Sequence, residues 1–91
     1  MTKIVLTAMV DDAAKWEKRL RTHGELLKTA TCKAVYYTVT KDNEVAMYAE
    51  AADVAKYFEV IGSPAIAESM AYDGVKRETV KVFVLDKEFT F

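Results

Sequence analysis

The 91-residue sequence holds only one cysteine, one histidine, one proline and three glycines. Because Cys32 is the only cysteine, no internal disulfide can form, and neither a CxxC nor an HxxxH pair is present. Protein metal sites commonly use such pairs, so the sequence predicts no bound metal ion. The glycines form no phosphate-binding loop, and no GxSxG motif marks a nucleophilic serine. We expect no bound cofactor either.

The chain also lacks an excess of either charge. Its 13 basic and 14 acidic residues give a net charge of −1, which argues against a nucleic-acid partner. No apolar run approaches the roughly 20 residues that span a bilayer, so we expect no membrane partner. The first residues do not have the basic segment and apolar core of a signal peptide. We therefore expect a reducing, cytoplasmic setting.

What the chain does have is enough apolar residues for one folded domain, residues 1–91. Hydrophobic residues make up 52% of the sequence. A domain of this length buries only about 60 to 65% of the surface that its unfolded chain exposes. The free energy of unfolding of a single chain should therefore be modest, and packing against a second copy would increase it.

Periodicity at the start of the chain predicts a strand followed by one long helix. Residues 3–10 (KIVLTAMV) are rich in β-branched residues and end at Asp11 and Asp12, which suit a turn and a helix N-cap. From there to residue 30 the spacing is helical. The apolar stripe of this helix consists of Ala13, Trp16, Leu20, His23, Leu27 and Ala30.

Residues 32–40 and 45–50 are typical of two strands of a hairpin, with Asp42 and Asn43 in the turn. A second helix is predicted over residues 52–61. Its expected buried positions are Val54, Phe58 and Ile61.

A short third helix follows. Ser63 is a good N-cap, Pro64 occupies the position where a helix best tolerates proline, and Gly74 suits a left-handed helix end. The final segment, residues 75–91, alternates like a long last strand.

This order predicts an α+β, ferredoxin-like βαββαβ fold, in which a four-stranded antiparallel sheet carries helices on one face. If Val80, Val82 and Val84 pack under the helices, the other side of the last strand is apolar as well. It presents Phe83, Leu85, Phe89 and Phe91. That is too much apolar surface to leave in water, so we predict a homodimer in which two sheets pack face to face.

Three stretches resemble those of small dimeric α+β barrel proteins, which include the antibiotic-biosynthesis-monooxygenase-like domains. They are the pattern of Asp12, Trp16 and His23, the segment ADVAKYFEVIGSPAIAESMAYDGV, and the closing ETVKVFVL. The resemblance implies a ferredoxin-like protomer, a homodimeric α+β barrel, and a cleft between sheet and helices. Some members of this superfamily oxidise polycyclic phenols without a cofactor, some cleave haem, and many have no known activity.

The active members of that superfamily typically use an asparagine near the first strand, with tryptophan and histidine elsewhere. Here the first strand has no asparagine, and the only one in the chain is Asn43 in the predicted hairpin turn.

His23 is the candidate catalytic residue, because histidine is the only side chain whose unperturbed pKa lies near neutrality. It is a general base, a metal or haem ligand, or a partly buried side chain satisfied by a backbone or tyrosine partner. Trp16 lies seven residues earlier, so it shares a helix face with His23. Trp16 either walls a ligand cleft or belongs to the core.

Three tyrosines are candidate ligand-binding residues. Tyr36 and Tyr37 are adjacent on a strand and must point to opposite faces, so one of them faces the helices. Tyr48 on the neighbouring strand can share a face with Tyr36. The alternative is plain cross-strand aromatic packing.

Two functions therefore remain open. In the first, the cleft binds a small apolar or aromatic molecule for a cofactor-independent oxidation or an isomerisation. In the second, the chain is a non-catalytic dimer that binds a regulatory ligand or serves in assembly.

Overall fold

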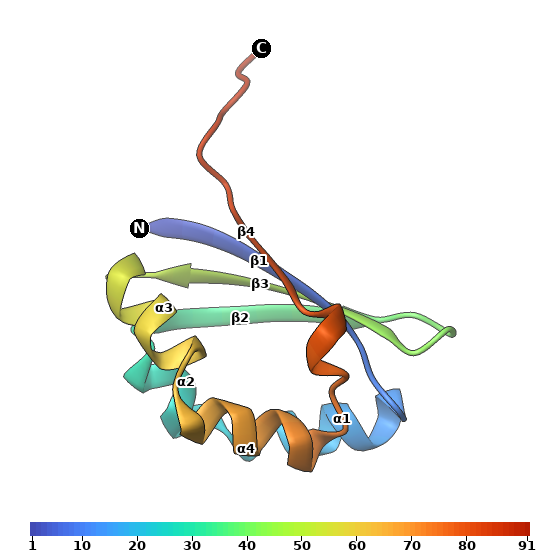
Figure 1. The fold of residues 1–91 in the computed structure, drawn as a ribbon. Coiled ribbons are helices and arrows are strands. Elements are labelled where there is room, and N and C mark those ends of the chain that lie inside the picture. The colour runs from blue at the N-terminus through green and yellow to red at the C-terminus, as the bar shows by residue number, and fades with distance from the viewer.

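The computed structural model describes residues 1–91 as an α+β fold of two layers (Figure 1). One layer is an antiparallel sheet with the strand order β2-β3-β1-β4, and the helices cover one of its faces, which confirms the predicted ferredoxin-like architecture. The strands are β1 (Thr2–Met9), β2 (Cys32–Val39), β3 (Glu44–Ala51) and β4 (Lys81–Val84). The helices are α1 (Ala13–Leu20), α2 (Gly24–Thr29), α3 (Val54–Ile61), α4 (Pro64–Asp73) and the 3₁₀ helix η1 (Arg77–Thr79).

The single long helix predicted up to Ala30 is wrong, because the chain forms two helices with a break before Gly24. At the break, the N–H groups of Thr22 and His23 bond to carbonyls three residues back, and the Thr22 hydroxyl donates to the Arg19 carbonyl. Threonine, histidine and glycine in succession are poor helix formers, so the ladder of bonds ends here. His23 therefore precedes α2 instead of lying within a continuous helix.

The second helix buries a different face from the predicted one. Tyr57 and Val60 are buried, whereas Phe58 is 44% exposed. Helical spacing allows both faces, since Val54 and Ile61 are compatible with a stripe through either Tyr57 or Phe58. The choice depends on which face meets the sheet, and that is a tertiary property.

The predicted ends of α4 are confirmed. Ser63 is the N-cap and its hydroxyl accepts a hydrogen bond from the Ile66 N–H, Pro64 begins the helix, and Gly74 ends it with a left-handed φ of 80°. Only a residue without a Cβ adopts that conformation cheaply. This end matters because it holds the last side chain of the helix, Asp73, against the body of the protein.

The predicted long last strand is also wrong in extent, since regular pairing covers only Lys81–Val84. Before it, the backbone of Met9 bonds to the Thr79 hydroxyl and to the Lys76 N–H, so η1 takes the place of strand pairing. Val82 packs on the core as expected, but Val84 at the sheet end is exposed. Residues 85–91 have no regular structure and project away from the body (Figure 1).

The core lies between the sheet and the helices in two clusters. Alternate residues of β1 point into it, because side chains of a strand alternate between faces. The first cluster is Ile4, Ala30, Ala51, Tyr57, Val60 and Ile66, and the second is Leu6, Ala8, Val10, Trp16 and Val45. Every helix falls short of the length and apolar character that a bilayer crossing demands.

Candidate functional site

A cavity of about 80 Å³ lies between the sheet and the helices, and 15 of its 18 lining residues are hydrophobic. Its floor is formed by inward-facing residues of the two central strands, and its roof by all four α-helices. The strand residues are Ile4, Leu6, Ala8, Val45, Met47 and Ala49. The polar residues of the lining are His23, Ser69 and Asp73. An apolar space with a small polar end suits a small apolar or aromatic ligand.

His23 and Asp73 form the polar end of this cavity. The Nε2 atom of His23 lies 3.0 Å from Oδ1 of Asp73, and the two residues are 50 positions apart in the sequence. Asp73 is only 6% exposed and is the one charged residue among the fully buried ones. A buried carboxylate is costly unless it is paired, so this contact explains how Asp73 can be buried.

The pair has a geometry that can serve proton transfer. An ionised Asp73 accepts a hydrogen bond from the Nε2–H of His23, which leaves the lone pair of the neutral ring on Nδ1. No protein group hydrogen-bonds to Nδ1. A histidine oriented by a carboxylate, with its other nitrogen unoccupied, is the arrangement of a general base.

Arg19 and Tyr72 form the outer wall beside His23. The Tyr72 ring meets the imidazole edge-on at a centroid distance of 6.4 Å, and the Arg19 guanidinium stacks 4.4 Å from the Tyr72 centroid. Arg19 also donates a hydrogen bond to the Tyr72 carbonyl. These contacts hold the end of α4 against α1, and with it the carboxylate of Asp73.

Trp16 belongs both to the core and to the cavity wall, so the structure brings it together with His23. It is 3% exposed, lines the cavity, and packs edge-on against Tyr37 at 5.6 Å. Tyr37 faces the helices and donates its hydroxyl proton to Glu17, but it does not line the cavity. Tyr37 therefore supports the cavity wall through its contact with Trp16.

Tyr36 and Tyr48 lie on the opposite face of the sheet, away from the cavity. They are directly paired across β2 and β3, with ring centroids 6.0 Å apart. The Tyr48 hydroxyl donates to Glu50, and desolvation, together with that carboxylate, raises the pKa of Tyr48. The structure therefore separates these two tyrosines from Trp16 and His23.

Three cavity residues with polar side-chain atoms escaped the sequence analysis, namely Ser69, Asp73 and Tyr57. Asp73 left one signal, because an acidic residue in the last turn of a helix is electrostatically unfavourable and calls for a compensating partner. Tyr57 left no signal, because helical spacing fits a buried stripe through Phe58 equally well.

Alkaline pH is expected to weaken the fold through Tyr57. Burial, and secondarily the Cys32 thiol, raises the pKa of Tyr57 from 10.0 to about 12. Because the folded protein holds this proton more tightly, the stabilisation is complete below pH 10 and is lost as the pH rises through 12. Between these values, the free energy of unfolding in urea should fall by about 2 kcal/mol more for the wild type than for Tyr57→Phe. Equal falls would contradict this assignment.

No protein-family model matches the sequence, and no curated protein matches it. Solved structures do match over nearly the whole chain. A proposed antibiotic biosynthesis monooxygenase from Bordetella bronchiseptica has a TM-score of 0.75 at 14% identity, covering 97% of both chains.

Two further structures agree. SnoaB, a cofactor-independent oxygenase from Streptomyces nogalater, has a TM-score of 0.69 at 16% identity, covering 98% of this chain and 94% of SnoaB. A proposed antibiotic biosynthesis monooxygenase from Caulobacter crescentus has a TM-score of 0.69 at 17% identity, covering 97% of this chain and 90% of the other. The chain thus has the α+β fold of the antibiotic-biosynthesis-monooxygenase-like proteins, as its sequence resemblance predicted.

Proposed function

We propose that this protein binds a small apolar or aromatic molecule in the cavity between sheet and helices, and that His23 acts on it as a general base. The single observation that carries the proposal is the contact between His23 and the buried Asp73 at the edge of an otherwise apolar cavity. A purely structural core would not need a buried charge at that position.

The reaction that fits best is a monooxygenase-like oxidation of a phenol by molecular oxygen. His23 Nδ1 takes the hydroxyl proton, and the electron-rich phenolate carbon reduces O₂ as a C–O bond forms. Loss of water from the resulting C–OOH group breaks the O–O bond and leaves a carbonyl. The substrate supplies all four electrons, so no cofactor is needed. The same base could instead return the proton to another carbon, which would be an isomerisation.

The fold comparison supports this choice without deciding it, because one matching structure is a cofactor-independent oxygenase. The alternative, a non-catalytic module that binds a regulatory ligand, is favoured by a different observation. The cavity volume of about 80 Å³ is small for a polycyclic substrate.

The test is binding and oxygen uptake with phenol, hydroquinone and 1-naphthol. At least one of them is expected to raise the melting temperature of the wild type and to be consumed together with O₂ in an oxygen electrode. His23→Gln should still bind, because its amide can donate to Asp73. Its oxygen uptake should be lower by about 100- to 10,000-fold, since it cannot take a proton.

Three outcomes separate the alternatives. Binding without oxygen uptake by the wild type would favour the non-catalytic module. Equal oxygen uptake by the wild type and His23→Gln would remove His23 from the reaction. No binding of any phenol would argue against the cavity as a ligand site.

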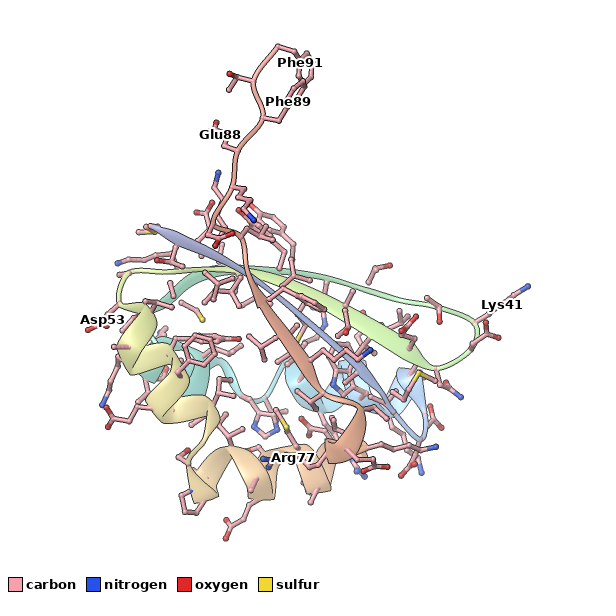
Figure 2. All side chains as sticks on the ribbon, turned by 45° about the horizontal axis from the view of Figure 1, so that its top comes forward. Lys41, Asp53, Arg77, Glu88, Phe89 and Phe91 are labelled. Atoms are coloured by element: carbon pink, nitrogen blue, oxygen red, sulfur yellow. The ribbon has the colours of Figure 1, made fainter.

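We also propose that the protein is a homodimer in which the open faces of the two sheets pack together. A row of apolar side chains crosses all four strands on that face, because Tyr36 pairs with Tyr48, Tyr48 with Val5, and Val5 with Phe83. Tyr36 is 65% exposed and Phe83 is 49% exposed. Figure 2 shows Phe89 and Phe91 further along the projecting segment, clear of the body. A second copy of this face would cover a surface that is costly to leave in water.

Light scattering at micromolar concentration should give twice the 10.2 kDa mass of the chain. The double variant Tyr36→Glu, Phe83→Glu should give the mass of one chain, because it places charge in the interface. Ala71→Glu, at an exposed position of α4, is the matched control and should remain dimeric. A wild type with the mass of one chain would refute the dimer.

A further inference from the structure

Tyr57 is the one buried tyrosine whose hydroxyl has no hydrogen-bond partner. It comes from α3, lines the cavity and is 4% exposed. The hydroxyls of Tyr37 and Tyr48 each donate to a glutamate, and those of the exposed Tyr36 and Tyr72 can reach water. Buried tyrosine hydroxyls normally have a partner, and losing one costs about 1 to 3 kcal/mol.

The Tyr57 hydroxyl is nevertheless open to an approaching group. Every side-chain nitrogen or oxygen atom that is fully sealed from solvent in this protein has a hydrogen-bond partner. Since Tyr57 makes no such bond, its hydroxyl oxygen belongs to the small part of the residue that stays accessible. Because Tyr57 lines the cavity, an occupant of the cavity can replace water as the partner of this hydroxyl.

Tyr57 keeps its proton at neutral pH, so its hydroxyl can donate a hydrogen bond to such an occupant. Burial raises the pKa of Tyr57 to about 12, and burial likewise raises the pKa of the neighbouring Cys32 thiol. Both groups are therefore uncharged, and the phenol keeps its proton.

The other residues that line the cavity favour an uncharged ligand. The carboxylate of Asp73 faces the same cavity, and most of the other lining residues are apolar. A ligand that enters as an anion would lose its hydration and meet a like charge. A neutral acceptor, such as a carbonyl oxygen, avoids both costs.

From these observations we infer that the Tyr57 hydroxyl donates a hydrogen bond to a neutral carbonyl oxygen of the bound molecule. This inference rests on the proposed ligand cavity and narrows its ligand class. Tyr57 then favours a ligand that carries a carbonyl as well as the hydroxyl on which His23 acts, over a ligand of the same shape without the carbonyl.

The test compares cyclohexanone with methylenecyclohexane, which differ in shape only by an oxygen in place of a CH₂ group. Dissociation constants for both are measured by NMR titration of the wild type, of Tyr57→Phe and of Tyr36→Phe. The Tyr57→Phe change should weaken cyclohexanone binding by about 2- to 10-fold and leave methylenecyclohexane unaffected. Tyr36→Phe, at an exposed position on the sheet face away from the cavity, is the control and should change neither.

The outcomes are distinguishable. If both probes bind and Tyr57→Phe leaves the ratio of their dissociation constants unchanged, the inference fails and the cavity proposal stands. If neither probe binds the wild type, the inference and the ligand cavity both fail. Because phenylalanine keeps the buried ring, the variant should fold, and its NMR spectrum reports this directly.

Discussion

Replacing Trp16 with alanine is expected to lower the free energy of unfolding by about 3 to 5 kcal/mol, the usual range for a buried tryptophan. Trp16 is almost fully buried and packs with β1 and β3 residues in the second core cluster. Its removal also takes away the edge-on contact with Tyr37 and enlarges the cavity that the indole lines. The surrounding sheet cannot collapse into that space without breaking strand pairing.

Urea denaturation at one fixed protomer concentration measures this effect, because a dimer would make stability depend on concentration. Trp16→Phe is the matched variant and should cost clearly less, since it keeps an aromatic ring in the wall. Tyr37→Phe removes only the hydroxyl that donates to the partly exposed Glu17, so its effect should be about 1 kcal/mol or less. A Trp16→Ala variant as stable as Tyr37→Phe would show that the indole is not part of the core.

The second large effect is expected at the hydrogen bond between His23 and the buried carboxylate of Asp73. His23→Ala should cost about 2 kcal/mol, because it leaves the carboxylate of Asp73 buried without its partner. The value is below the range for fully buried pairs, since His23 is partly exposed. Adding Asp73→Asn removes the charge, so the double variant should be more stable than His23→Ala alone.

A double-mutant cycle tests this coupling. Losses for His23→Ala and Asp73→Asn that simply add would mean that the two side chains do not interact in solution. A loss of stability in His23→Ala therefore cannot separate a structural histidine from a catalytic one. His23→Gln separates them, because its amide can keep the hydrogen bond to Asp73 but cannot take up a proton.

Much of the fold could be predicted from local patterns. The signals that predicted these elements depend only on residues close by in the sequence. They are the β-branched run of β1, the turn residues of the hairpin, and Ser63, Pro64 and Gly74 at the ends of α4. The opposite orientations of Tyr36 and Tyr37 follow from the alternation of a strand. The strand predicted beyond Val84 does not continue, because a strand needs a neighbour to pair with, and after the bond from the Leu85 N–H to the Lys3 carbonyl no strand pairs with residues 86–91.

The candidate site could be predicted only in part. Trp16 and His23 lie one helical period apart, and both line the cavity even though the helix breaks between them. Asp73 could not be assigned to His23, since their contact depends on how α4 crosses the end of α1. Tyr57 could not be separated from Phe58, because the buried face of α3 is chosen by the sheet beneath it.

The sequence by itself determined the element types, most of their order, the caps of α4 and the two-faced character of the sheet. These features arise from backbone preferences and from side-chain periodicity, which operate over a few residues. The tertiary structure alone decided the pairing of His23 with Asp73, the unpartnered hydroxyl of Tyr57 and the separation of Tyr36 and Tyr48 from the cavity. Each depends on groups far apart in the chain, and only packing brings such groups within hydrogen-bond or van der Waals distance.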